Sequence, residues 1–306
     1  MKNIEIIKKS KIWYLISGIL CSISILSIIL FGLKVSIDFT GGSLMELSFS
    51  EFNDGIDITS ASSMKKYFDE NIADTETGEF TVQKVDDNYY MFKFQEVNEE
   101  KHQEILSSIR EKLDPETKEE AYQFIGSIIG NELKEKTYIT VFLVVFLIIL
   151  YIAWAFRKVS YPVSSWKYGV SAIVALIHDV LIMIGIFSIL GLLFNIQIDI
   201  LFITAILTTL GYSVNDTIVV YDRIRENLKR TNDKFDVLVN KSINENIKRS
   251  IYTSFTTLIV LLSIYFFGGA SVKNFVLALI IGVVVGTYSS IFIASPLLVT
   301  WNSHKK

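Results

Sequence analysis

The hydrophobic positions of this chain gather into long uninterrupted runs separated by shorter polar stretches. Six of these runs are about 18 to 23 residues long, which is enough for a helix to cross a hydrocarbon core of about 30 Å. The pattern predicts membrane spans at 12–33, 137–156, 170–193, 198–220, 250–267 and 274–300. The predicted fold class is therefore an α-helical polytopic membrane protein with six transmembrane helices.

The first run follows Lys8, Lys9 and Lys11, as the apolar part of a secretory signal would. It is too long for such a signal and has no small-residue cleavage site. We expect it to remain as a membrane anchor. It also contains Cys21, the single cysteine of the chain, so no intrachain disulfide can form.

The polar segment 34–136 lies between the first two spans and is the one long enough to form a domain. Its pattern predicts a strand near Leu44, a helix at 60–72, two strands at 80–85 and 89–94, an amphipathic helix at 99–113 and a short strand at 121–125. This order of elements is typical of a ferredoxin-like α+β sandwich. We expect such a domain outside the cytoplasm, between helices 1 and 2.

Lysine and arginine are concentrated in alternate connections, which sets the expected orientation. They are frequent in the tail 1–11, between the second and third spans, in 221–249 and in the tail 301–306, whereas 195–199 and 268–274 contain only Lys273. Because positively charged loops stay in the cytoplasm, we expect both tails and the loop 221–249 to be cytoplasmic. The same rule places 34–136 on the other side of the membrane.

Composition narrows the functional class. Hydrophobic residues make up 51% of the 306 residues, and the net charge is only −3, so the charge gives no reason to expect a nucleic-acid partner. The sequence has no phosphate-binding loop G-x-x-x-x-G-K-[ST] and no H-E-x-x-H metal motif. We expect no enzymatic activity, no metal and no cofactor, with a transmembrane ion gradient as the remaining energy source.

Charged residues inside a span are candidates for function because burying a charge in lipid is costly. Asp216 falls in the fourth span, and Arg249 begins the fifth. Each lies on a polar stripe with helical spacing, formed by Thr209, Ser213 and Asp216 (with Asn215 beside them) and by Arg249, Thr253, Thr256 and Thr257. We expect the two stripes to face each other, with Asp216 and Arg249 forming an ion pathway. The alternative is that both residues only mark helix ends.

Two further patterns within the spans favour structural roles. His178 and Asp179 are adjacent in the third span, so their side chains are expected to point about 100° apart and not to share one face. We expect both to have a buried, hydrogen-bonded structural role. Small residues recur at every fourth position in the last span, at Gly282, Gly286, Ser290 and Ala294. This spacing predicts close helix packing.

Four motifs together resemble a known family. They are the segment 37–42 with Asp38, Gly41 and Gly42, the segment 211–227 around Asp216, the segment 242–257 around Arg249, and 265–269. In this order they are similar to the signatures of the SecF family over nearly the whole chain. One departure is the sequence Ile125-Gly126-Ser127, where the family often has Val-Gly-Pro.

The resemblance implies a multi-pass protein of the bacterial cytoplasmic membrane that pairs with SecD and associates with the SecYEG channel. It further implies use of the proton or sodium motive force, as in resistance-nodulation-division exporters, to promote late translocation of a preprotein. Asp216 and Arg249 occupy the positions of the family's ion pathway. The residues themselves leave the coupling ion, H⁺ or Na⁺, open. They also leave open an exporter of small molecules and a membrane-anchored scaffold.

Overall fold

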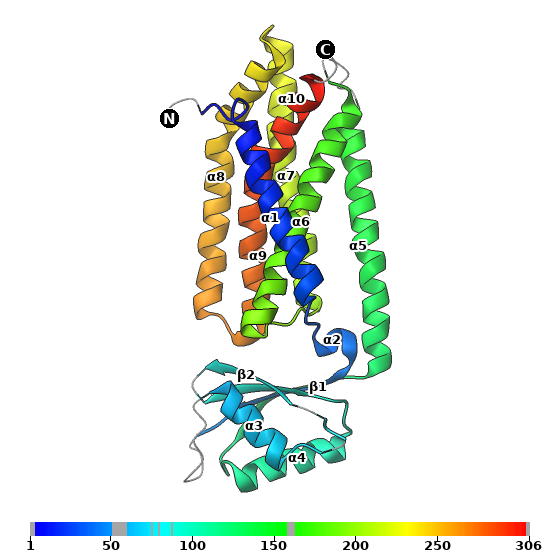
Figure 1. Ribbon diagram of the computed structural model, residues 1–306, viewed down its shortest axis with the longest axis vertical. Coiled ribbons are helices and arrows are strands. Elements are labelled where there is room, and N and C mark those ends of the chain that lie inside the picture. Colours follow the sequence, from blue (N-terminus) through cyan, green and yellow to red (C-terminus); the bar gives the residue numbers. More distant parts are fainter. Residues whose placement is uncertain are drawn as a thin grey trace. The chain divides into compact units, whose positions relative to one another are not determined.

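The computed structural model describes residues 4–50, 60–74, 76–78, 80–86, 88–157 and 163–303. The chain forms two compact units (Figure 1). One, here called the helical unit, comprises Met1–Lys34 and Ile139–Lys306. The other, here called the α+β unit, comprises Val35–Tyr138.

Within the described residues, six helices are long and apolar enough to cross a membrane, which confirms the predicted number of spans. They are α1 (Ser10–Phe31), α5 (Ser127–Ala155), α6 (Ser165–Phe194), α7 (Ile200–Arg230), α8 (Phe235–Phe267) and a last one built from α9 (Ala270–Ser289), the π-helical turn η1 (Ser290–Ala294) and α10 (Ser295–Ser303). The chain is therefore a multi-pass membrane protein.

The helices fall into a central and a peripheral group. Half of the apolar stretch of α6, of α7 and of the last helix is buried, whereas less than a fifth is buried in α1, α5 and α8. In Figure 1, α1 lies along α6, and α9 lies against both α7 and α8. The exposed apolar side chains of α1, α5 and α8 form the surface that would meet lipid or another subunit.

The helices extend further than the apolar runs that predicted them. The segment 221–249, expected as a cytoplasmic loop, is helical except at 231–234, because α7 continues to Arg230 and α8 starts at Phe235. Side chains join the two polar helix ends: the Asn227 amide donates to Ser242 Oγ at 2.9 Å, and Arg223 Nε donates to Glu245 Oε2 at 2.6 Å. Polar residues end the membrane span but not the helix.

Small residues allow the central helices to approach closely. A Cβ atom added to Gly282 of α9 would lie 2.2 Å from Oγ1 of Thr209 on α7, and one added to Gly286 would lie 3.0 Å from Cβ of Ser213. At the α1–α6 contact, a Cβ on Gly185 would lie 2.3 Å from Cβ of Ser24. Side chains larger than glycine do not fit at these crossings without moving the helices apart.

The α+β unit contains a four-stranded antiparallel sheet in the order β2-β3-β1-β4. Its elements, in chain order, are α2 (Ile37–Thr40), β1 (Gly42–Ser48), α3 (Ala61–Asn71), β2 (Thr81–Asp86), β3 (Tyr89–Phe94), α4 (Glu99–Lys112) and β4 (Lys118–Ile125). Alternation along β1 and β3 directs Met45, Leu47, Phe92 and Phe94 into one core with α3 and α4.

Local signals explain where these elements start and turn. The Ser60 hydroxyl accepts the N–H of Ser63 at 3.2 Å, and the Asn98 side chain accepts the N–H of Lys101 at 2.8 Å, so both helices begin at capping residues. Asn88 has φ +58° and turns the chain between β2 and β3. The predicted hairpin is present, although Asp87 lies outside the described residues.

Replacing Phe68 by alanine tests whether the α+β unit is an independent domain. Phe68 is fully buried and stacks on Phe92 with ring centroids 4.2 Å apart, so the variant should lose about 3–5 kcal/mol of unfolding free energy. Urea unfolding of a fragment comprising residues 36–134 measures this loss. The exposed Lys66→Ala on the same helix should change stability by less than about 0.5 kcal/mol. A wild-type fragment without a cooperative transition would contradict the expectation.

Gly282→Ala tests the close approach of α7 and α9. The added methyl group would collide with Thr209, so we expect a lower melting temperature in detergent, and Thr209→Ala in the same chain should recover part of the loss by removing the two nearest atoms. Gly211→Ala is the matched control, because an added Cβ there meets nothing within 4 Å and should gain about 0.5–1 kcal/mol of helix propensity. Equal melting temperatures for both alanine variants would refute the packing argument.

Candidate functional site

Asp216 lies on α7 at the point where α8 and η1 meet it. Its side chain is half-buried. The Ser250 hydroxyl of α8 donates to Oδ1 at 2.5 Å, and the Ser290 hydroxyl of η1 donates to Oδ2. Two neutral hydroxyl donors from two helices thus hold this carboxylate. They give each carboxylate oxygen a hydrogen-bond donor but bring no positive charge to it.

The structure does not bring Arg249 to Asp216. Arg249 is exposed, and no ion pair joins the two among the residues that the structure describes. The reason is rotation about the α8 axis. Ser250, the next residue along α8, faces α7, and one residue turns the helix by about 100°. The expected pairing of the two charges is therefore absent from this arrangement.

The remaining residues of the two predicted stripes have separate surroundings. Thr253, Thr256 and Thr257 donate to backbone carbonyls of their own helix, and Asn215 is exposed. The polar face that α8 turns toward its neighbours is instead Ser250 and Ser254. The Ser254 hydroxyl contacts Thr287 Oγ1 at 2.6 Å and accepts a hydrogen bond from the Tyr212 hydroxyl at 2.9 Å.

A second carboxylate, that of Asp179 on α6, is only 1% exposed. His178 Nδ1 lies 2.9 Å from its Oδ1, while Ser213 of α7 and Ser289 at the end of α9 both donate to its Oδ2, at 2.6 and 2.7 Å. Both residues are buried and hydrogen-bonded, as expected, although they were not expected to share one face. Their Cβ directions diverge, but the side chains turn toward each other and form one group.

Sequence reasoning missed Asp179, Ser250, Ser289 and Ser290 as members of the site. For Asp179 the signal was present, because two ionisable residues sit in the middle of a predicted span. For the serines it was not, because serine is common in membrane helices for packing reasons. Ser213 was noted as a neighbour of Asp216 but binds Asp179, and Thr209 lies buried against Gly282.

Ser289 and Ser290 are consecutive residues at the junction of α9 and η1. The first donates to Asp179 and the second to Asp216. The change from α- to π-helical winding at this junction is of a kind often found at functional sites. Ser290 was expected as a packing residue, and in the structure it also donates a hydrogen bond to the carboxylate of Asp216.

The motif around Asp38, Gly41 and Gly42 belongs to the α+β unit. Asp38 is half-buried in the short helix α2. Gly41 has φ +75°, and a Cβ added to it would lie 2.6 Å from Cα of Ser127. Gly42 has φ +140°, and a Cβ added to it would lie 2.8 Å from the carbonyl oxygen of Phe94. Both glycines are required by backbone conformation and by close approach.

The tripeptide Ile125-Gly126-Ser127, which departs from the pattern Val-Gly-Pro, has a function that proline could not supply. The N–H of Ser127 donates to Oε2 of Glu96 at 3.1 Å. Proline has no N–H. In this chain a hydrogen bond fixes the start of α5, where a proline ring would otherwise restrict the backbone.

Outside the spanning helices, one ion pair affects a pKa strongly. Lys101 Nζ lies 2.6 Å from Oδ2 of Asp74, and this contact lowers the pKa of Asp74 to about 2. The stability it adds is present above the unfolded value of about 3.9 and is lost as pH falls toward the folded value. The pair remains ionised near neutral pH, so it stabilises the α+β unit and does not sense pH.

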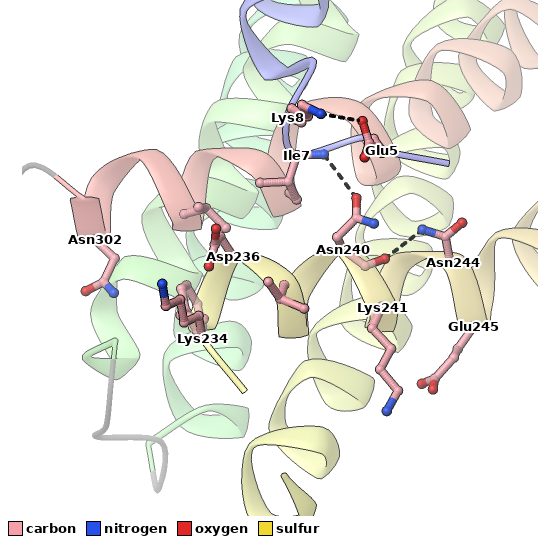
Figure 2. Close-up of a pocket in the computed structure, with 13 residues that line it drawn as sticks. Glu5, Ile7, Lys8, Lys234, Asp236, Asn240, Lys241, Asn244, Glu245 and Asn302 are labelled. Atoms are coloured by element: carbon pink, nitrogen blue, oxygen red, sulfur yellow. Dashed lines mark hydrogen bonds and ion pairs between the residues drawn. The ribbon is translucent and has the colours of Figure 1, made fainter. Parts of the chain in front are cut away.

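A cavity of about 1150 Å³ lies beside the start of α8 (Figure 2). Neither Asp179 nor Asp216 is among the residues that line it. Asn240 and Asn244 bind the backbone of Ile4 and Ile7 and so attach the N-terminal segment to α8. Three lysines and three acidic residues line it, Lys8, Lys234, Lys241, Glu5, Asp236 and Glu245. The balance of charge favours neither anions nor cations.

Comparison with known proteins finds relatives over nearly the whole chain. The family described as "Protein export membrane protein SecD/SecF, C-terminal" matches residues 105–304, and the "SecD/SecF GG Motif" family matches 26–51, around Gly41 and Gly42. The protein translocase subunit SecF of Thermobaculum terrenum is 39% identical over 302 residues, covering 98% of this chain and 94% of that protein. The SecF of Haemophilus influenzae is 33% identical over 295 residues, covering 95% and 83%.

Two solved structures are also similar. The crystal structure of SecDF, a translocon-associated membrane protein from Thermus thermophilus, superposes with a TM-score of 0.84 at 30% identity. That of SecDF in a super-membrane-facing form gives 0.68 at 31% identity. They cover 98% and 100% of this chain, which spans 39% of the length of each. By its family match and its relatives, the chain belongs to the SecD/SecF family of protein export membrane proteins.

Proposed function

We propose that this chain is an accessory subunit of the Sec protein translocase, which works with a SecD-like partner to promote late steps of preprotein translocation. Relatives named protein translocase subunit SecF match it over nearly its whole length, and SecDF structures contain a similar fold. The family consists of translocase subunits and not of enzymes. Contacts with the SecYEG channel and with the moving preprotein are part of the proposal.

The observation that carries the proposed energy source is the carboxylate of Asp216 between Ser250 and Ser290. As an anion it accepts both hydroxyl protons. Once it binds a proton, or its charge is neutralised by Na⁺, at least one of these contacts must weaken. Because the donors belong to α8 and η1, loading and unloading of Asp216 would change how tightly these elements pack on α7.

Arg249 enters the same proposal through rotation of α8. Turning α8 by one residue, about 100°, would bring Arg249 to the position that Ser250 occupies beside Asp216. In that state the arginine charge would favour release of the ion from the carboxylate. The arrangement described here, with Ser250 at the carboxylate and Arg249 exposed, would be the other state.

The orientation is proposed from charge and connectivity. The order β-α-β-β-α-β, with strands in the order β2-β3-β1-β4, supports a ferredoxin-like fold for the α+β unit, between α1 and α5. The distribution of lysine and arginine supports an extracytoplasmic position for this unit and a cytoplasmic position for both termini. The membrane would be the bacterial cytoplasmic membrane.

The alternatives considered for the sequence are less well supported. A membrane-anchored scaffold would gain nothing from carboxylates buried among apolar helices, since each costs free energy to bury. An ion-driven exporter of small molecules would use the same carboxylates. The names of the relatives favour protein as the transported substrate.

Asp216→Asn should abolish the stimulation of protein export by an ion gradient. Asparagine keeps the shape of the side chain: its amide oxygen can accept from one serine, and its NH₂ group can donate to the other. It cannot take up an ion as the carboxylate does. The measurement is gradient-driven export of a preprotein into vesicles that contain the SecYEG translocase, this chain and its SecD-like partner. Assembly of the complex should be unchanged.

The matched control for that experiment is Asp222→Asn on the same helix, where the carboxylate is exposed and pairs with Arg225. It should export at the wild-type rate. Arg249→Met should fail as Asp216→Asn does, and the double variant should be little worse than either if the two residues serve one step. Wild-type export by Asp216→Asn would rule out ion coupling at this residue.

Labelling of single cysteines tests the orientation. In a Cys21→Ser background, Ser107→Cys in the α+β unit and Lys229→Cys at the end of α7 are both exposed positions. A membrane-impermeant thiol reagent added outside intact cells should modify Ser107→Cys alone, and Lys229→Cys should react only after the membrane is opened. Modification of both from outside would show that the proposed topology is incorrect.

A further inference from the structure

The proposed ion coupling at Asp216 does not use the most deeply buried carboxylate of the helical unit. Asp179 is 1% exposed and contacts three helices: its own α6 through His178, α7 through Ser213, and the end of α9 through Ser289. Hydroxyl donors stabilise its charge, but no lysine or arginine pairs with it in the described part of the chain. A lone buried carboxylate of this kind is costly for a purely structural purpose.

The two ring nitrogens of His178 differ in their hydrogen bonding. Its Nδ1 lies 2.9 Å from Asp179 Oδ1, whereas its Nε2 is buried and has no hydrogen-bond partner among the described residues. If Nδ1 carries the proton that it donates to Asp179, then Nε2 is a bare acceptor. An incoming proton can form an Nε2–H bond while the Nδ1 proton moves to Oδ1. The imidazole then stays neutral, and the carboxylate becomes a carboxylic acid.

Among the residues that the structure describes, no lysine, arginine, glutamate or other aspartate forms a hydrogen bond or ion pair with His178 or Asp179. The thiol of Cys21 on α1 interacts electrostatically with Asp179. The ring of Tyr288 from α9 stacks on His178, with ring centroids 6.0 Å apart. Ser213 and Ser289 complete the group and do not titrate. His178 and Asp179 are therefore the hydrogen-bonded acid–base pair of this group.

We propose that His178 and Asp179 form a second proton-binding site in the helical unit, coupled to Asp216 through the junction of α9 and η1. The proposal rests on the ion-coupled function proposed above. Ser289 donates to Asp179 and its neighbour Ser290 donates to Asp216, so consecutive residues of one backbone connect the two sites. Protonation of Asp179 weakens its hold on Ser289 and Ser213, and a shift of that junction moves Ser290 against Asp216.

Asp179→Asn removes the titratable carboxylate but can keep the hydrogen bonds that Asp179 makes. The asparagine oxygen can still accept from Ser213 and Ser289, and its NH₂ group can donate to Nδ1 of a neutral His178. We expect an unchanged melting temperature and normal assembly with the SecD-like partner. In vesicles with that partner, infrared difference spectra against pH should lose one titrating carboxylic-acid carbonyl band, a band that Asp216→Asn retains. Gradient-stimulated export should also be lost.

Two further variants keep the test decisive. If Asp179→Asn fails to assemble, His178→Gln takes its place: it keeps an amide donor for Asp179 but has no basic nitrogen that could take up a proton as Nε2 does, so it should alter the same band and abolish stimulation. Ser188→Ala is the control, since it removes another buried hydroxyl of α6, which donates to Ser27 O at 2.9 Å. It should leave spectra and export unchanged.

The outcomes distinguish the two proposals. Wild-type export or an unchanged set of bands in Asp179→Asn, or in His178→Gln where the first variant does not assemble, overturns the second site. If Asp216→Asn is inactive in the same assay, ion coupling at Asp216 still stands. Normal export by Asp216→Asn would instead overturn the proposed function on which the second site rests.

Discussion

The need to supply hydrogen-bond donors to carboxylates within an apolar bundle determines how the central helices pack. Inside lipid no water can solvate an acidic side chain, so the donors must come from neighbouring helices. Asp179 receives them from α7 and the end of α9, and Asp216 receives them from α8 and η1. These bonds fix the rotation of each helix about its own axis, which apolar packing alone leaves loosely defined.

The same bonds require short distances between helix axes, and this explains the small residues. A serine hydroxyl reaches only a short way from its backbone, so a carboxylate on the next helix can be reached only if the two backbones lie close together. Gly282 and Gly286 allow this at the contact of α7 and α9, next to Ser289 and Ser290 on the same helix. The glycines therefore let the helices approach closely enough for Ser289 and Ser290 to reach the carboxylates of Asp179 and Asp216.

The sequence predicted the parts of the fold that depend on long one-dimensional patterns. Six apolar runs predicted six helices, and alternation within 34–136 predicted the order of strands and helices, because both patterns follow from burial of whole segments. The helical hairpin made by 221–249 was not predicted, since polarity shows where lipid ends and not where a helix ends. Charged residues such as Arg223 and Glu245 are good helix formers when they pair across the hairpin.

Of the candidate site, the sequence singled out Asp216 but not the residues that contact it. Helical spacing correctly grouped Thr209, Ser213 and Asp216 on one side of α7, yet these three have different neighbours, since a helix in a bundle meets a different partner at each depth. The position of Arg249 shows the same limit: spacing gives directions within a helix and cannot give its rotation against the next one. Only packing showed that Ser250, one residue further, faces Asp216.

The two halves of α8 are held differently. Only 11% of its apolar stretch is buried, against half of α6, α7 and the last helix, whereas Leu238, Val239 and Ile243 near its start are buried in the core of the helical unit. Its polar contacts at Ser250 and Ser254 are single hydroxyl bonds, each worth about 0.5–1.5 kcal/mol. If ion binding at Asp216 moves α8, as proposed above, the part of α8 beyond Ser250 has less apolar packing to lose than its start, which the core holds in place.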